Sequence, residues 1–318
     1  MNKKETVQFP VKKIIIIILM SIVILALYFF VYKNHFNLSQ SNFSSKKSDV
    51  SLPLRVYFFD IGQGDATFIE FPNGEQMLID CAVDARILEA LGRTMSFYDR
   101  EIDYLVVTHP DMDHYGGCID LLHRFRIKTL IYDGFEKNES EYWRFFMDTL
   151  RSFEASGLNF IQADSEFSWD RGGTRVDFLF PDRDILIQGP PKGVDPSSGN
   201  NASIVIKMTY GSQDFLFMAD AEYELEQYLL EKYGDRLEVE VLKVGHHGSD
   251  TSSSQNFLDQ VNPTYAIISS GEDNKYGHPS KRVLKRLERK GATIWRTDRE
   301  GDILMSVYHD TIEMYAKK

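Results

Sequence analysis

The chain holds a dense group of possible metal ligands between Thr108 and Cys118, where the sequence reads THPDMDHYGGC. Two histidines and two aspartates fall within six positions there: His109, Asp111, Asp113 and His114. Imidazole nitrogens and carboxylate oxygens bind divalent cations such as Zn²⁺ and Mn²⁺. A single such residue on a loop is usually only solvated, but four of them so close together indicate a metal site.

The flanking sequence places this motif on the turn from a strand into a helix. Residues 102–107 are apolar and β-branched, as in a buried strand, and residues 118–126 have apolar side chains at helical spacing. Loops at the C-terminal ends of strands in open α/β sheets surround a common crevice. Gly116 and Gly117 allow the backbone to turn tightly beside that crevice.

Three later segments also adjoin apolar strands. Asp220 follows residues 215–219, His246 and His247 follow residues 241–244, and Asn201 and Ser203 precede residues 204–206. Asp220 could equally cap a helix, and adjacent histidines are often surface residues. Two-metal hydrolases hold their cations about 3.5–4 Å apart around a shared carboxylate. The chain supplies enough ligands for such a dinuclear site with a bridging hydroxide: His109, Asp111, Asp113, His114, Asp220 and His246.

The rest of the chain alternates between strands and helices, in two similar halves. We expect strands at residues 55–60, 66–71, 76–80, 129–132, 159–162, 174–180, 202–210, 214–218, 238–244 and 265–269, with three short strands at the end. Expected helices span residues 85–91, 140–155, 221–233 and 280–289, and residues 188–200 form a loop. This pattern predicts an α/β fold of two sheets packed face to face with helices outside.

The N-terminal region has a composition of its own. Residues 14–32 are almost continuously apolar, and as a helix they would rise roughly 28 Å, close to the thickness of the hydrocarbon core. Four lysines precede this run and one adjoins it, which favours an uncleaved anchor with a cytoplasmic N-terminus. We therefore predict a cytoplasmic segment (1–13), a transmembrane signal anchor (14–32), a polar linker (33–52) and an extracytoplasmic domain (53–318).

Charge and cysteine content restrict the partners and the covalent structure. The 318-residue chain has a formal net charge of −11, and only two of its 47 acidic residues precede Val50, against seven of 36 basic ones. The body is therefore more acidic still, which disfavours tight nucleic-acid binding unless a local basic groove or the metals supply attraction. We expect Cys81 and Cys118 to be buried free thiols, although their pairing stays open.

Six segments in order resemble metallo-β-lactamase-fold proteins of the ComEC-type competence group. These are residues 59–66 (FDIGQGDA), 108–117, 200–203 (NNAS), 218–220 (MAD), 242–249 (LKVGHHGS) and 276–279 (YGHP). The resemblance covers nearly everything from Leu54 onward. It implies an αββα metallo-β-lactamase sandwich, with the site along one edge between the sheets.

The resemblance also implies individual roles. The first metal would be bound by His109 and Asp111, the second by Asp113, His114 and His246, with Asp220 bridging. His247 would be a less favoured ligand or a substrate contact, and Asn201 a weak ligand or substrate contact. His278, in the segment that resembles the family's YGHP, could donate a proton or bind phosphate. From their residue types and positions, Asp113 could also act as a base and Ser249 could contact phosphate, while Asp65 and Asp80, on loops after the opening strands, could orient the ligating histidines.

One departure from the wider superfamily bears on the choice of metal. The usual pattern is H-x-H-x-D-H, whereas Asp111 stands at the second histidine, as it does in the competence group. An oxygen-rich first site favours Mn²⁺ without excluding Zn²⁺. A third histidine for that site has no counterpart, since Asn201 occupies this part of the chain.

Three functions remain open from the sequence. The first is an extracytoplasmic metal-dependent phosphodiesterase, by family analogy a nuclease in DNA uptake, working with a separate channel protein because one apolar helix cannot form a channel. The second is a hydrolase of an envelope phosphoester such as a teichoic-acid or phosphocholine group, which would tolerate an acidic surface better. The third is a catalytically inactive, membrane-tethered binding module.

Overall fold

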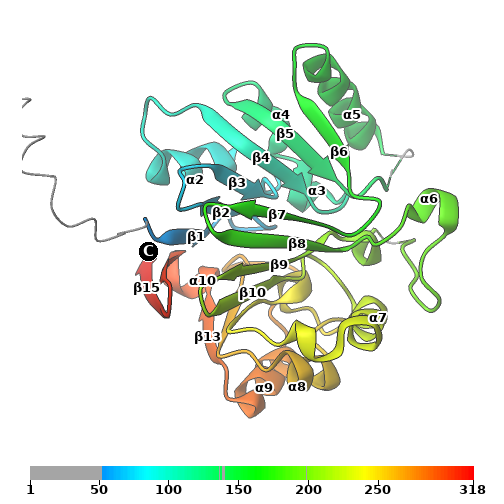
Figure 1. The fold of residues 1–318 in the computed structure, drawn as a ribbon, viewed down its shortest axis with the longest axis vertical. Coiled ribbons are helices and arrows are strands. Elements are labelled where there is room, and N and C mark those ends of the chain that lie inside the picture. The colour runs from blue at the N-terminus through cyan, green and yellow to red at the C-terminus, as the bar shows by residue number, and fades with distance from the viewer. Residues whose placement is uncertain (1–51, 136, 138–139, 198) are drawn as a thin grey trace, which may run out of the picture. The chain divides into compact units, whose positions relative to one another are not determined.

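The computed structural model describes residues 52–135, 137, 140–197 and 199–318. Within this part of the chain, two sheets lie face to face with helices on their outer surfaces (Figure 1). The predicted segments 1–13, 14–32 and most of 33–52 lie outside the described residues. No helix among the described residues combines the length and the apolar character that crossing a bilayer requires.

The first sheet has eight strands in the order β15-β14-β1-β2-β3-β4-β5-β6. Its strands pair antiparallel from β15 to β3 and parallel from β3 to β6. The strands are β1 (Leu54–Phe58), β2 (Thr67–Glu70), β3 (Gln76–Ile79), β4 (Glu101–Val107), β5 (Arg126–Tyr132), β6 (Asn159–Gln162), β14 (Asp302–Tyr308) and β15 (Thr311–Lys317).

The second sheet has seven strands in the order β13-β12-β11-β10-β9-β8-β7. It is antiparallel from β7 to β10 and parallel from β10 to β13. The strands are β7 (Phe167–Arg171), β8 (Thr174–Phe180), β9 (Val205–Tyr210), β10 (Gln213–Phe217), β11 (Val241–Lys243), β12 (Tyr265–Ile268) and β13 (Thr293–Arg296).

A serine caps the start of three helices, α5, α8 and α9. The hydroxyls of Ser140, Ser254 and Ser280 each accept a bond from the third backbone N–H of the helix that follows. The helices are α2 (Arg86–Thr94), α3 (Met112–Tyr115), α4 (Cys118–Leu122), α5 (Glu141–Glu154), α6 (Ile185–Gln188), α7 (Tyr223–Tyr233), α8 (Gln255–Val261), α9 (Lys281–Lys290) and α10 (Thr297–Glu300), with 3₁₀ turns η1 (Asn200–Ala202), η2 (Gly234–Leu237) and η3 (Gly245–Gly248).

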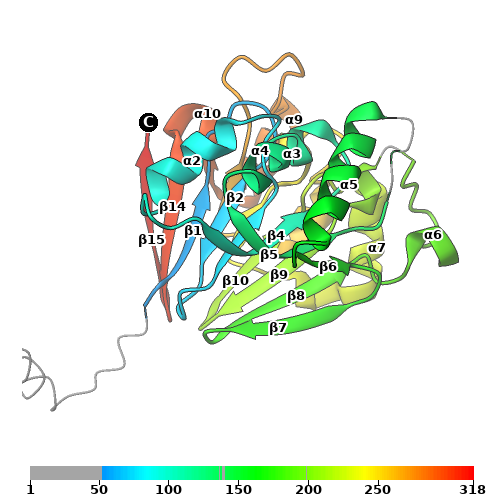
Figure 2. The same cartoon turned by 90° about the horizontal axis from the view of Figure 1, so that it is seen from above.

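Three apolar layers hold these elements together. One joins α2, α4 and α5 to the first sheet, as Figure 2 shows, and one joins α7, α8 and α9 to the second. The third fills the space between the sheets, where Phe58 of β1 stacks on Phe217 of β10 with ring centroids 6.4 Å apart. The predicted pair of face-to-face sheets with outer helices is confirmed.

Local patterns misplaced a few elements. The helix expected over residues 118–126 ends at Leu122, because Arg126 already begins strand β5. Strand β7 was not predicted, because it is only five residues long and its alternation of apolar and polar residues is therefore short. Helix α8 was also missed, because the serine-rich run before it indicated a loop, whereas Ser254 caps the helix.

The expectation of free thiols is wrong, because Cys81 and Cys118 form a disulfide with Cα atoms 5.2 Å apart. The backbone after β3 lies directly against the metal-ligand motif. Cys81 N donates to His114 O at 2.7 Å, and Gly117 N donates to Ala82 O at 3.1 Å. A Cβ at Gly117 would lie 2.2 Å from Cys81 O, so only glycine permits this approach. Sequence separation alone could not reveal the contact.

Candidate metal centre

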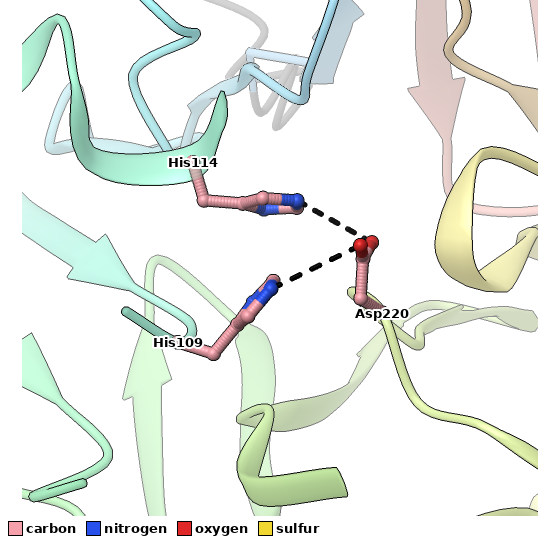
Figure 3. Close-up of side chains that lie close together, drawn as sticks. All are labelled: His109, His114 and Asp220. Atoms are coloured by element: carbon pink, nitrogen blue, oxygen red, sulfur yellow. Dashed lines mark ion pairs between the residues drawn. The ribbon is translucent and has the colours of Figure 1, made fainter. Parts of the chain in front are cut away.

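Both sheets contribute to a cluster of side chains at one edge of the sandwich. His109 lies in the turn after β4, His114 lies on α3, and Asp220 follows β10 of the second sheet. Both imidazoles point at the Asp220 carboxylate (Figure 3), with His109 Nε2 3.9 Å from Oδ2 and His114 Nε2 3.4 Å from Oδ1. All three side chains are buried. Side chains from both sheets therefore converge at Asp220.

A second compact group shares His114 with the first. Asp113, His114 and His247 offer ligand atoms that lie within 4.8 Å of one another. His247 Nε2 is 3.4 Å from Asp113 Oδ2 and 3.7 Å from Asp220 Oδ2. Asp220 thus lies within reach of both groups, the position that a bridging carboxylate requires.

The residues present fit divalent cations. Within the described part of the chain, four buried atoms of the cluster lack a hydrogen-bond partner: Nε2 of His109, Nε2 of His114, Nε2 of His247 and Oδ1 of Asp220. An unpaired buried polar atom costs about 1–3 kcal/mol, and here the atoms face one another. Cations held between these side chains would give all four atoms a partner.

Two residues of the cluster, His109 and Asp220, have the charge state that cation binding requires. Burial lowers the pKa of His109 to about 4, with His114 acting in the same direction, so the His109 nitrogen keeps its lone pair at neutral pH. Burial opposes ionisation of Asp220, yet the imidazoles of His114, His247 and His246 hold its pKa well below the usual range. Asp220 is therefore a carboxylate, as a bridging ligand must be.

Asp80 orients both histidines of the first group. Its Oδ2 lies 2.7 Å from His114 Nδ1 and accepts the Thr108 hydroxyl at 2.8 Å, while its Oδ1 accepts Thr108 N at 2.9 Å. The Thr108 oxygen in turn lies 3.1 Å from His109 Nδ1. These bonds leave both Nε2 atoms facing Asp220. Thr108 was not predicted, although it immediately precedes the first motif histidine.

Asp65 lies behind His247 and is paired with a buried lysine. Lys243 Nζ is 2.8 Å from Asp65 Oδ2, and Asp65 Oδ1 is 3.7 Å from His247 Nδ1. His247 Nδ1 also lies 3.2 Å from Ser269 O, to which it can donate. Lys243 was not predicted; the available signal was a charged residue inside the apolar strand β11.

Asp111 lies at the margin of the cluster. Its Oδ2 is 4.0 Å from His109 Nε2, while its Oδ1 forms an ion pair with Lys137. Asp111 belongs to none of the compact ligand groups found among the described residues. The candidate first site therefore has fewer converging ligands than the candidate second site, in line with the absence of a third histidine from the sequence.

The two adjacent histidines take different positions, because both have positive φ and η3 turns sharply between them. His246 Nδ1 lies 3.3 Å from Glu222 Oε1, and its Nε2 lies 3.7 Å from Asp220 Oδ2. His247, not His246, lies in the compact groups within the described chain. Sequence position favoured His246 as the ligand, whereas this geometry favours His247.

Asn201 and Ser249 are occupied by local structure. The Asn201 amide donates to Asp195 O at 3.1 Å and to Glu224 Oε2 at 3.3 Å, and its oxygen accepts from Glu222 N at 3.0 Å. The Ser249 hydroxyl lies 3.0 Å from Thr251 Oγ1 and accepts from Thr251 N. Neither side chain is directed at the metal cluster by these bonds.

A cavity of about 160 Å³ opens onto the cluster. Asp111, Asp113, Asp220, His246 and His247 line it together with His278, Tyr276, Asn274 and Gln63. His278 Nδ1 is buried without a partner among the described residues, and its ring centroid is 5.7 Å from that of His246. The same cavity is therefore lined by the candidate metal ligands and by His278, which is not one of them.

Comparisons with known proteins agree with this arrangement. A family model described as the metallo-beta-lactamase superfamily matches residues 59–272. ComE operon protein 3 of Bacillus subtilis (strain 168) is 29% identical over 276 residues, covering 78% of this chain and 32% of that protein. Competence protein ComA of Neisseria gonorrhoeae is 30% identical, covering 77% of this chain and 31% of that protein.

The chain spans about a third of the length of these relatives. Among solved structures, CmlA, a diiron β-hydroxylase from Streptomyces venezuelae, superposes with a TM-score of 0.50 at 14% identity. That match covers 80% of this chain and 54% of CmlA. At this level of identity the likeness concerns the fold alone.

Proposed function

The chain belongs to the metallo-beta-lactamase superfamily, a family of metal-dependent hydrolases, and from this premise we propose that it hydrolyses phosphodiesters. The observation that carries the proposal is the convergence of four buried, unpaired ligand atoms around Asp220 beside a cavity. A phosphodiester is anionic and resists attack by water. Cations held beside the cavity would attract the anionic diester and stabilise the charge that develops during the attack.

The ligands divide into two sets. Asp113, His114 and His247 would hold one cation, His109 and Asp111 the other, and Asp220 would contact both. When bound, the cations neutralise the phosphate charge and lower the pKa of the attacking water. Asp113 would orient that water and accept its proton at a carboxylate oxygen. His278 would donate a hydrogen bond, and finally a proton, to the leaving oxygen.

Asp80 and Asp65 would act through the histidines. Asp80 fixes the ring of His114 directly and that of His109 through Thr108. Asp65, held by Lys243, lies behind the ring of His247. Rigid histidines avoid the cost of ordering the ligands when a cation binds, which supports a preformed site. Mn²⁺ remains our preferred cation over Zn²⁺, because Asp111 makes the first site oxygen-rich.

We also propose that residues 14–32 anchor the protein, with the catalytic domain outside the cytoplasm. The disulfide between Cys81 and Cys118 supports placement of the domain outside the cytoplasm, since disulfides persist in oxidising compartments. A separate channel protein is a proposed partner for a role in DNA uptake, since two relatives are named as a ComE operon protein and a competence protein.

One observation favours a second candidate. The acidic body would repel a long polyanion, so a small envelope phosphoester such as a phosphocholine group is the alternative substrate. The inactive binding module is disfavoured by the nearly complete ligand set.

The test is a substrate panel with the purified protein supplied with Mn²⁺ or Zn²⁺. We expect cleavage of bis-p-nitrophenyl phosphate and of DNA, and a loss of at least about a hundredfold in Asp113→Ala. Cleavage of a phosphocholine ester alone would select the alternative substrate. Absence of activity on every phosphoester, in protein shown to contain metal, would refute the phosphodiesterase proposal.

A further inference from the structure

The disulfide between Cys81 and Cys118 joins two segments that build the candidate metal centre. Cys81 directly follows Asp80, whose carboxylate lies 2.7 Å from His114 Nδ1. Cys118 begins helix α4, four positions after His114. One covalent bond therefore connects the segment that orients a ligand histidine to the segment that carries this histidine. The proposed hydrolysis assigns no part to either cysteine.

The backbone around Cys81 is held in an unfavourable conformation. Asp80 and Ala82 have φ angles of 61° and 62°, in the left-handed region that residues other than glycine rarely adopt. Such residues keep this conformation only where surrounding contacts impose it. Here Ala82 N donates to Asp65 O at 2.9 Å, and Cys81 N donates to His114 O at 2.7 Å. The position of the Asp80 carboxylate therefore depends on how firmly this segment is held.

The helices on the other side of the bond are short. Helix α3, which carries Asp113 and His114, has four residues, and α4 has five. Helices shorter than about 12–15 residues are marginal by themselves, and neither of these two has a side-chain cap at its start within the described chain. The directions of the Asp113 and His114 side chains are therefore set by tertiary contacts, of which the disulfide is the covalent one.

Both cysteines are fully buried in the apolar layer between the first sheet and its helices, where α4 packs beside α2 (Figure 2). A reductant reaches such a bond only after the surrounding structure opens. The bond therefore forms while the chain folds and persists afterwards. This placement suits a single step of maturation and not repeated switching.

We propose that the disulfide between Cys81 and Cys118 sets the metal affinity of the centre, so that the folded protein binds its tighter cation with full affinity only once this bond has formed. The inference rests on the proposed metal centre and not on the identity of the substrate. Both cysteines are positioning residues, because they act on the cations through Asp80 and α3. A chain that still holds two thiols would be poorly loaded with metal until it reached an oxidising compartment.

The bond forms by thiol–disulfide exchange with an oxidant that itself carries a disulfide, such as oxidised glutathione or an oxidoreductase. The thiolate of one cysteine attacks a sulfur of the oxidant and releases one oxidant thiolate. The thiolate of the second cysteine then attacks the mixed disulfide, closes the protein disulfide and releases the other oxidant thiolate. The two cysteines lose two electrons, the oxidant gains them, and the two thiol protons end on the oxidant's sulfurs.

A general gain in stability is the alternative explanation. The bond links residues 37 positions apart, and a cross-link of this kind restricts the unfolded chain wherever it lies in the fold. That effect changes the fraction of molecules that are folded, whereas a loss of positioning changes the cation affinity of molecules that are folded. Metal affinity measured on folded protein therefore separates the two explanations.

Calorimetric titration of the full-length protein with Mn²⁺ tests the positioning role. We expect Cys81→Ala/Cys118→Ala to bind the tighter cation about ten- to a hundredfold more weakly, as loss of groups that orient metal ligands generally does. The matched control is Leu287→Ala, which destabilises the apolar layer of the second sheet, whereas both cysteines lie in that of the first. The Mn²⁺ affinity of the control should stay within about twofold of the unmodified protein.

Reduced unmodified protein gives a second measurement that needs no substitution. Protein refolded with a phosphine reductant, then freed of the reductant without air, should show the same loss of Mn²⁺ affinity. Refolding with oxidised glutathione should restore the affinity, and the double alanine variant should respond to neither treatment. Equal affinity in the reduced and oxidised forms would overturn the inference. So would a reduced chain that does not fold by circular dichroism, because the bond would then be a requirement of the whole fold.

Hydrogen exchange of the metal-free protein locates the change. The amides of residues 81 and 117, which donate to His114 O and Ala82 O, should accelerate in the double alanine variant at least about tenfold more than the amides of β11 and β12. The Leu287→Ala protein should show no such excess. Uniform acceleration across both sheets in the double alanine variant would indicate general destabilisation and would contradict the positioning role.

The oxidised, unmodified protein separates this inference from the proposed function. If it binds Mn²⁺ and cleaves bis-p-nitrophenyl phosphate while the double alanine variant binds Mn²⁺ equally well, the disulfide inference fails and the proposed function stands. If the variant binds Mn²⁺ at least about tenfold more weakly but the oxidised protein cleaves no phosphodiester, the reverse holds. An oxidised protein that binds no cation would refute the metal centre itself.

Discussion

At the scale of single residues, the centre depends on which nitrogen atoms remain free. Hydrogen bonds engage Nδ1 of His109, His114 and His247, which leaves each Nε2 facing the carboxylate of Asp220 or Asp113. His246 also has its Nδ1 paired, with Glu222, and its Nε2 lies 3.7 Å from Asp220 Oδ2, but it belongs to none of the compact ligand groups within the described chain. The two adjacent histidines should therefore contribute differently to metal binding.

Substitution of these histidines gives the first prediction. His247→Ala should weaken the tighter cation at least about a hundredfold, since it removes a buried ligand, whereas His246→Ala should change metal affinity less than about tenfold. Calorimetric titration with Mn²⁺ and metal content after dialysis would measure both. If His246→Ala lost the metal and His247→Ala retained it, His246 would be the ligand, as its sequence position indicated.

At the scale of elements, helix α7 supports the loop that follows the histidine turn. Glu226 on α7 is buried and accepts the backbone N–H groups of Ser253 and Ser254, and Ser254 caps α8. Burial, the main cause, raises the pKa of Glu226 to about 7, although these N–H groups and Arg286 favour the charged form. Protonation of Glu226 is therefore coupled to the packing of α7 against α8.

This linkage predicts a pH-dependent stability. The folded state keeps the Glu226 proton between about pH 4.5 and pH 7, where the unfolded chain releases it, so the contribution is complete below about pH 4.5 and is lost as pH rises through 7. The size is on the order of 3 kcal/mol. Relative to Glu226→Gln, the free energy of unfolding of the unmodified protein should be higher at pH 5 than at pH 8 by this order.

Urea unfolding in the presence of a chelator, at both pH values, would measure the difference without metal linkage. Other titrating groups, such as the buried Asp133, are common to both proteins and cancel. A constant difference between the two proteins from pH 5 to pH 8 would show that Glu226 keeps an ordinary pKa.

At the scale of the whole domain, the metal cluster joins the two sheets. His109 and His114 come from the edge of the first sheet, and Asp220 and His247 come from the second. Cations bound between these residues would cross-link the sandwich in addition to the apolar layer between the sheets. Metal binding should therefore be coupled to global stability.

Metal removal gives the corresponding prediction. A cation present at a hundred times its Kd adds about 2.7 kcal/mol, which corresponds to a rise of about 5–10 °C in Tm for a domain of this size. A chelator should lower the Tm of the purified protein by that amount, and added Mn²⁺ should restore it. Asp220→Asn should abolish the response. A Tm insensitive to chelator in the unmodified protein would favour the inactive binding module.

Much of this architecture could be predicted because it is encoded locally. Apolar runs such as residues 102–107 and 241–244 specify buried strands through their own composition, and the motif from His109 to His114 places four ligands on one turn. Asp220 was identifiable for the same reason, since it follows an apolar strand. Strand ends of a parallel sheet share an edge, which predicts a site at the C-terminal ends of these strands, whereas the convergence of residues from two sheets on Asp220 depends on the packing of the sheets.

Only the tertiary structure decided the relations between distant segments. The disulfide between Cys81 and Cys118, the Lys243–Asp65 pair and the Thr108–Asp80 network each depend on contacts between segments that are separated in sequence. The geometry that favours His247 over His246 depends on positive φ angles at both residues of η3, which allow both adjacent imidazoles to approach Asp220. Local patterns determine which elements form, but side-chain direction and pairing are fixed by packing across the whole fold, so no segment carries that information alone.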